Sequence, residues 1–382
     1  MINKVKIMLE KNKQINLISR KIVQFPDLIA NMFRTLSFYN IKAYFYPVNP
    51  PDFPGYITEF NRKGISGIAF GVNKNNPLKV ELLIDGKVIN TTYASQKILF
   101  PTKYRGQFIG FYFPLKRIWQ YISKDQKIEI RTEGDKLLRM HSGKGVGKAL
   151  PKKYMSLVVE KNIIELIDEG RVINKFGRIQ AHRDKSEGWL GKVSTSYTII
   201  NDLFEEKTGK SLFIFYGTML GYARDGGVMA HDCDLDLAYF SEKTTPEDVR
   251  AEFFEITKKL INKGEKITPF IYKLLFNKRS LSVTPCWISD GVFSSTFGYV
   301  GDGYIVEKDD ILPLKKVDFY GNELYLPNNP VNVAKYIYGR GWKYPDPGWK
   351  WLPEYKNYPQ ILEGRLTSLQ VKTLEKMIDN EN

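Results

Sequence analysis

The chain has 382 residues, of which 43% are hydrophobic and 26% charged, and this composition predicts a globular protein long enough for two domains. Its formal net charge of +15 suits polyanionic partners such as nucleotides, phosphorylated glycans or an anionic membrane surface. With two cysteines, no run of 18 apolar residues and no signal-peptide pattern, we expect a cytoplasmic protein without disulfides or membrane-spanning helices. Motifs for zinc binding or for sequence-specific recognition of nucleic acid are lacking, so neither is expected.

The first 45 residues predict a basic amphipathic helical segment. Lysines alternate with apolar residues, and the spacing indicates one helix over Lys4–Lys21 and another over Pro26–Phe38. Such helices either make a peripheral contact with the inner face of an anionic membrane or pack on the protein with their lysines in solvent. Both interpretations remain open. The proline-rich segment Tyr44–Gly55 then predicts an extended linker.

Residues 46–140 predict an antiparallel β-sandwich-like accessory domain. Asp85-Gly86 separates two strand-like runs and is typical of a tight hairpin turn. The domain shows no evident catalytic constellation. The expected strands, short and rich in β-branched and aromatic residues, are Gly64–Val72, Leu78–Ile84, Gln96–Phe100, Phe108–Phe113 and Lys127–Arg131.

Helices and strands mix in the second half of the chain. Residues 141–185 predict a connection with a helix over Tyr154–Glu169, and helical spacing follows over Ser194–Glu206. Thr245 and Pro246 are typical of a helix N-cap and N1, opening a helix to about Asn262. Strands are expected over residues 267–300. This order predicts an α/β or α+β fold with a mixed sheet.

Three aspartates alternate in a short acidic row, Asp232, Asp234 and Asp236. If the row is a strand, the three carboxylates share one face, about 6–7 Å apart. Like charges at that spacing favour a hard divalent cation such as Mg²⁺ or Mn²⁺. A solvated edge strand with an acidic outer face is the alternative.

A phosphate-binding pattern lies just upstream of the acidic row. Leu212–Tyr216 predicts a strand, Gly217-Thr218 a turn and Met219–Arg224 the first turns of a helix. Backbone N–H groups, a hydroxyl and a helix dipole would together favour an anion. A phosphate cradle beside metal-binding carboxylates is what phosphoryl transfer requires.

The segment GTMLGYARDGGVMAHDCDLDLAYF resembles the signature of the LicD/fukutin-related phosphotransferases. Further similarity lies around Asp310–Lys316, Leu326–Pro330 and Tyr338-Gly339, so the resemblance covers roughly residues 186–352, followed by a C-terminal tail over 353–382. It implies a nucleotidyltransferase-like fold, a divalent metal, and transfer of phosphocholine or a polyol phosphate from a CDP-linked donor to a glycan, with release of CMP.

The resemblance and the charges assign roles to individual residues. Asp234 and Asp236 are expected to bind the metal, and Asp232 to be a further ligand or the base for the acceptor hydroxyl. The expected donor phosphate-binding residues are Gly217, Thr218, Gly221 and Arg224.

The chain also departs from the family pattern. Ser282 stands where the family tends to have an aspartate, so a third carboxylate ligand would have to be Asp232 or Asp290, or be missing. The aromatic, basic stretch Gly341–Trp351 predicts either a packed C-terminal arm or a cover for the donor base or sugar.

Two other classes of function remain open. A nucleotidyltransferase that consumes an NTP would use the same aspartates, and a non-catalytic glycan- or polyanion-binding protein would retain only a relic site. For the transferase, we expect a glycan acceptor at the cell surface, in lipopolysaccharide, capsule or teichoic acid, and a lipid-linked form of that acceptor would suit the membrane contact.

Overall fold

The computed structural model describes residues 54–70, 77–98, 107–140, 155, 159–261, 266–349 and 351–381. The helical segment predicted over residues 1–45 lies outside these ranges. The chain divides into two compact units, Met1–Phe53 with Lys97–Phe108, and Pro54–Gln96 with Ile109–Asn382. Most of the first unit lies outside the described ranges, and the second unit contains nearly all of the described helices and strands.

Residues 54–140 form two small sheets, with strand orders β6-β2-β1-β9 and β4-β3-β7-β8. Strands β1 and β9 run parallel. The pairs β1–β2, β2–β6, β3–β4, β3–β7 and β7–β8 are antiparallel. The strands are β1 (Gly55–Asn61), β2 (Gly64–Ala69), β3 (Lys79–Ile84), β4 (Lys87–Tyr93), β5 (Gln96–Lys97), β6 (Phe108–Pro114), β7 (Ile128–Thr132), β8 (Lys136–Leu137) and β9 (Arg139–Met140).

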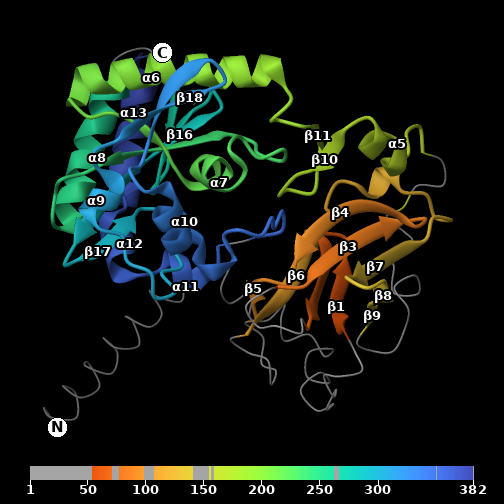
Figure 1. Ribbon diagram of the computed structural model, residues 1–382. Helices are drawn as coiled ribbons and strands as arrows, with labels where there is room; N and C mark the ends of the chain where they lie inside the picture. Colours follow the sequence, from red (N-terminus) through yellow and green to blue (C-terminus); the bar gives the residue numbers. More distant parts are fainter. Residues whose placement is uncertain are drawn as a thin grey trace, which may run out of the picture. The chain divides into compact units, whose positions relative to one another are not determined.

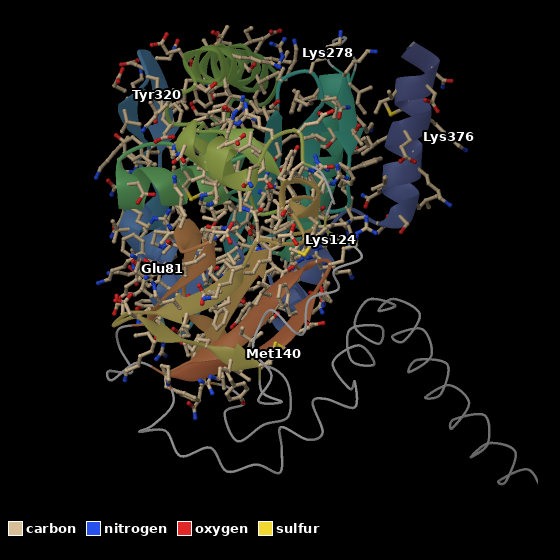
Figure 2. All side chains as sticks on the ribbon, turned by 90° about the vertical axis from the view of Figure 1, so that its right-hand side faces the viewer. Glu81, Lys124, Met140, Lys278, Tyr320 and Lys376 are labelled. Carbon is tan, nitrogen blue, oxygen red and sulfur yellow. The ribbon has the colours of Figure 1, made fainter. Side chains whose placement is uncertain are left out.

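Both sheets contribute to one apolar core, which confirms the sandwich-like arrangement. Ile57 and Ile65 from one sheet and Val80 and Ile130 from the other are fully buried in it. The hairpin turn forms as expected, with positive φ at Asp85-Gly86. On the outside, Glu81 (labelled in Figure 2) accepts two hydrogen bonds from Arg131 across the β3–β7 pair.

Helix α5 (Ile163–Asp168) and the hairpin after it pack on the β-rich core and lead to the second domain. Helix α5 is shorter than the helix predicted there, and its Ile163 is buried in the β-rich core. A hairpin of β10 (Arg171–Ile173) and β11 (Ile179–Ala181) follows. Helix α6 (Glu187–Thr208) then begins the second domain, longer at its N-terminal end than its apolar spacing indicated.

A mixed sheet forms the centre of the second domain, with strand order β12-β13-β16-β15-β14 and β17 paired with β16. Strands β13 and β16 run parallel, and the other pairs are antiparallel. This confirms the predicted mixed α/β fold. The strands are β12 (Phe213–Ile214), β13 (Leu235–Phe240), β14 (Ile267–Pro269), β15 (Leu274–Phe276), β16 (Leu281–Ser289) and β17 (Val292–Ser295).

Helices pack around this sheet, and α8 contacts α6, α12 and α13 (Figure 1). Thr245 caps α8 as predicted, because its hydroxyl accepts the Asp248 N–H at 3.2 Å. The remaining elements are α7 (Tyr216–Asp225), α8 (Pro246–Ile261), α9 (Lys308–Ile311), β18 (Lys315–Phe319), β19 (Asn322–Leu326), α10 (Pro330–Tyr338), α11 (Pro353–Lys356), α12 (Pro359–Gly364) and α13 (Ser368–Glu381), with short 3-10 turns at Trp119–Tyr121 and Gly339–Gly341.

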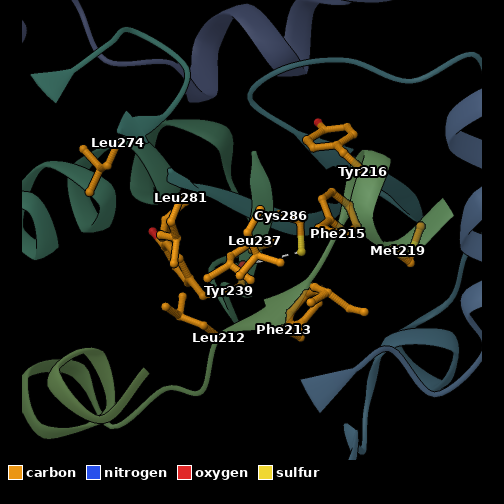
Figure 3. Packing of buried hydrophobic residues seen from close by; sticks show 14 of the residues in the cluster. Leu212, Phe213, Phe215, Tyr216, Met219, Leu237, Tyr239, Leu274, Leu281 and Cys286 are labelled. Carbon is orange, nitrogen blue, oxygen red and sulfur yellow. Dashed lines mark hydrogen bonds between the residues drawn. The ribbon is translucent and has the colours of Figure 1, made fainter. Parts of the chain in front are cut away.

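The core of the second domain surrounds β12, β13 and β16 (Figure 3). Phe213, Leu237 and Leu281 are fully buried there, and the Cys286 thiol donates to the Tyr239 carbonyl at 3.4 Å. Residues 353–381, expected as a tail, add Ile361 and Leu374 to the same core. None of the described helices combines the length and the apolar character that a membrane crossing requires.

Candidate functional site

The acidic row does not form one strand face. Strand β13 begins only at Leu235, so Asp236 lies in the strand while Asp232 and Asp234 lie in the segment that leads into it. The predicted alternation of faces therefore does not apply to the first two aspartates. Their positions depend instead on the contacts that each side chain makes.

Asp236 is held by two neighbouring elements, α7 and β16. Its Oδ2 accepts the Gly217 N–H at 3.3 Å, and its own backbone N–H donates to Thr218 Oγ1 at 3.0 Å. Its Oδ1 accepts the Ser282 hydroxyl at 3.1 Å, because Asp236 and Ser282 are paired in register on β13 and β16. Thr218 therefore positions Asp236, and Ser282 occupies the neighbouring-strand position anticipated for a third ligand.

Asp232 and Asp236 converge on the start of α7. A Cβ at Gly217 would lie 3.3 Å from Asp236 Oδ2 and 3.8 Å from Asp232 Oδ1, so the missing side chain lets both carboxylates approach the helix. The chain enters this helix through Tyr216, which has a positive φ of 39°. Gly217-Thr218, expected as a turn before the helix, thus form part of its first turn.

Burial changes the protonation of both carboxyls. Burial, together with the charge of Asp234, raises the pKa of Asp232 to about 7 and that of Asp236 to about 6. Asp232 Oδ1 accepts the Cys233 N–H at 2.9 Å, but Oδ2 is buried and no partner for it is found among the described residues. A buried carboxylate oxygen without a partner is unfavourable unless it is protonated or bound to a cation.

Comparison with family models identifies this region. Residues 209–329 match the model described as LicD/FKTN/FKRP, nucleotidyltransferase domain. Over this segment, which is less than half of the chain, the sequence is similar to the LicD/FKTN/FKRP family. A search of curated proteins finds no match to the chain.

The buried carboxylates of the LicD-family domain are chemically suited to a divalent metal. Asp232 and Asp236 offer hard oxygen donors beside the Ser282 hydroxyl, and the unpartnered Asp232 Oδ2 is a free ligand atom. Within the described ranges, no three His, Cys, Asp or Glu side chains form a ready-made metal cluster. Asp290, the other candidate third ligand, lies in the turn after β16, at the opposite end of that strand from Ser282.

Asp234 lies between two lysines that the sequence analysis did not identify. Its Oδ1 is 3.6 Å from Lys175 Nζ in the β10–β11 turn, and its Oδ2 is 3.8 Å from Lys273 Nζ in the β14–β15 turn. Burial by itself would lower the pKa of Lys175. The negative charges of the three aspartates outweigh this effect, so the pKa of Lys175 lies above its ordinary value. The LicD-family site thus combines acidic and cationic side chains from separate elements.

Arg224 and Gly221 have local structural contacts. Arg224, at the C-terminal end of α7, donates to Asp225 from Nε at 2.9 Å and from Nη2 at 2.7 Å. Gly221 allows close packing, since a Cβ there would lie 2.6 Å from the Gly227 carbonyl oxygen. Burial, together with the nearby charges of Arg224 and Lys175, lowers the pKa of His231 to about 4. The predicted phosphate-binding roles of Arg224 and Gly221 stay predictions.

The aromatic C-terminal stretch packs beside the acidic residues. The Trp351 ring lies 5.7 Å from that of Tyr216 and 5.9 Å from that of Tyr338, and the Trp349 ring lies 5.1 Å from Tyr338. Burial raises the pKa of Tyr338 well above its usual value, with Asp236 the next cause. The stretch is therefore packed, as one of the two earlier interpretations expected, and forms an aromatic wall near the LicD-family site.

Proposed function

We propose that the chain is a metal-dependent phosphotransferase that moves a substituted phosphate from a CDP-linked donor to a hydroxyl of a glycan and releases CMP. The family match supports a transferase. The observation on which the proposal chiefly rests is the convergence of Asp232 and Asp236 at the start of α7, with one buried carboxylate oxygen unpartnered. Such a pair is stable as anions only beside a cation.

We assign the metal-binding role to Asp232 and Asp236, with Asp234 as a further oxygen donor. When bound, Mg²⁺ or Mn²⁺ would neutralise charge on the donor diphosphate. Lys175 and Lys273, held near Asp234, are cations suited to the phosphate oxygens. The alternative role of Asp232, as the base that takes the proton of the acceptor hydroxyl, would require that it does not bind the metal.

Thermal unfolding with CDP-choline, CDP-glycerol, CDP-ribitol and the four NTPs, each with and without Mg²⁺, tests the proposal. A ligand that binds the native state stabilises it by about 2.7 kcal/mol at a hundredfold excess over Kd. We expect a Mg²⁺-dependent rise in Tm with at least one CDP-linked compound. A rise only with an NTP would favour a nucleotidyltransferase, and no rise at all would favour a non-catalytic binding protein.

Substitutions test the residue assignment. Asp236→Asn and Asp232→Asn should each abolish the Mg²⁺-dependent rise in Tm and lower CMP release at least a hundredfold, because each removes a charged ligand while preserving shape. Asp290→Asn is the matched control, since this aspartate lies in a distant turn with positive φ that asparagine tolerates. Normal CMP release by Asp236→Asn would refute the assignment.

A further inference from the structure

A strongly basic cavity lies outside the segment that matches the family. Its volume is about 320 Å³, and it is lined by Lys63, Tyr112, Pro114, Lys116, Arg117, Lys175, Phe176 and Arg178. Five of these side chains are cationic and none is acidic. The β1–β2 turn, the end of β6 with the segment after it, and the β10–β11 turn contribute the walls.

Backbone contacts join two of the segments that line the cavity. The backbone N–H of Arg117 donates to the Gly177 carbonyl at 2.9 Å, and a Cβ at Gly177 would lie only 2.5 Å from the backbone nitrogen of Lys116. Buried Asn174 holds the turn, because its Oδ1 accepts the N–H groups of Phe176 and Arg178 at 2.9 and 3.1 Å. The cationic side chains of Lys116, Arg117 and Arg178 therefore extend from closely packed, hydrogen-bonded backbone segments.

The charges in this cavity are largely uncompensated. Among the described residues, no carboxylate lies within 4.0 Å of the charged groups of Lys63, Lys116, Arg117 or Arg178; only Lys175 has such a partner, Asp234. Clustered like charges repel one another, and a bound anion would relieve that repulsion. Tyr112 and the half-exposed Phe176 add apolar faces beside the charges.

We propose that this cavity binds a phosphate group on the glycan acceptor and holds the acceptor beside the aspartates. The inference rests on the proposed transferase function. Lys175 lines the cavity and also lies 3.6 Å from Asp234, so the two sites adjoin. All eight lining residues lie outside residues 209–329, where the proposed donor and metal residues Gly217, Asp232 and Asp236 occur. The volume is at the small end of ligand pockets and suits one phosphorylated sugar unit.

Isothermal titration calorimetry with glucose 6-phosphate, in EDTA and without a donor, tests the proposal on the full chain. We expect the wild type to bind it at least tenfold more tightly than glucose, and the affinity to fall as salt increases. The double variant Lys116→Gln/Arg117→Gln should weaken binding at least tenfold. Arg178→Gln, in the β10–β11 turn, should weaken it as well. Lys175 is left unchanged because it contacts the candidate active site.

Lys136→Gln/Arg139→Gln is the matched control, because it removes one exposed lysine and one exposed arginine of the β-rich domain away from the cavity. It should bind glucose 6-phosphate like the wild type. The proposal is overturned if the wild type does not distinguish glucose 6-phosphate from glucose, or if the cavity and control variants weaken binding equally. It is also overturned if the cavity variants weaken binding of CDP and leave that of glucose 6-phosphate unchanged.

These outcomes are separate from failure of the proposed function. If no CDP-linked compound gives CMP but the cavity variants selectively lose glucose 6-phosphate, the cavity binds phosphate and the transferase proposal fails. If CMP is released and the cavity variants bind glucose 6-phosphate normally, the transferase proposal stands and the cavity assignment fails.

Discussion

Ser282 shows how a single side chain changes the chemistry of this site. It pairs with Asp236 across the parallel strands and donates a hydrogen bond to Oδ1 at 3.1 Å. This hydroxyl stabilises the ionised form of Asp236, whereas burial and Asp234 favour the neutral form. The site therefore has a neutral hydroxyl at position 282. A carboxylate there would add a metal ligand, but it would also repel the carboxylate of Asp236.

Ser282→Asp should make the protein less stable without metal and more responsive to it. A second carboxylate beside buried Asp236 is expected to lower the free energy of unfolding in EDTA by about 1–3 kcal/mol. Added Mg²⁺ should raise the Tm of the variant more than that of the wild type, because it neutralises the added charge. Thermal unfolding with EDTA and with Mg²⁺ measures both effects. Ser282→Ala is the control, and an equal response of the two variants to Mg²⁺ would show that position 282 does not face a metal.

At the scale of elements, the site depends on the close fit of α7 against the Gly226–Met229 loop. The Gly227 carbonyl approaches α7 at Gly221, and Tyr320, at the β18–β19 turn, accepts the Val228 N–H at 3.0 Å (Figure 2). This loop leads directly to Asp232. The position of the acidic residues therefore depends in part on how this loop packs against α7 and Tyr320.

Gly221→Ala should disturb this fit. Its Cβ would lie 2.6 Å from the Gly227 carbonyl oxygen, so the loop has to move, and we expect a loss of about 1–3 kcal/mol in unfolding free energy together with at least a tenfold loss of CMP release. Gly191→Ala on α6 is the control, because no atom lies within 4 Å of its added Cβ and alanine favours the helix by about 0.5–1 kcal/mol. Urea denaturation compares the two, and equal stability of both variants would show that the close approach does not matter.

For the whole molecule, local patterns predicted more than long-range ones. The family resemblance was predictable because the Gly217–Asp236 motif is short and continuous in sequence. The mixed fold was predictable because residue types such as those of Asp85-Gly86 favour particular local conformations. Alternation failed at Asp232 and Asp234, since strand pairing with β16 begins only at Leu235. Lys175 and Lys273 were missed because they belong to turns distant in sequence, and no local periodicity brings them to Asp234.

The C-terminal residues show the same limit, because a segment expected as a tail completes the core. Leu374 of α13 is fully buried in the larger core, whereas Leu369 of the same helix is 75% exposed. Leu374→Ala should lower the free energy of unfolding by about 2–5 kcal/mol through lost burial and a cavity. Leu369→Ala is the matched control, expected within about 0.5 kcal/mol of the wild type. Urea denaturation decides between them: equal and small effects would mean that α13 does not belong to the folded core, and a large effect of Leu374→Ala alone would make residues 353–381 part of the folded second domain.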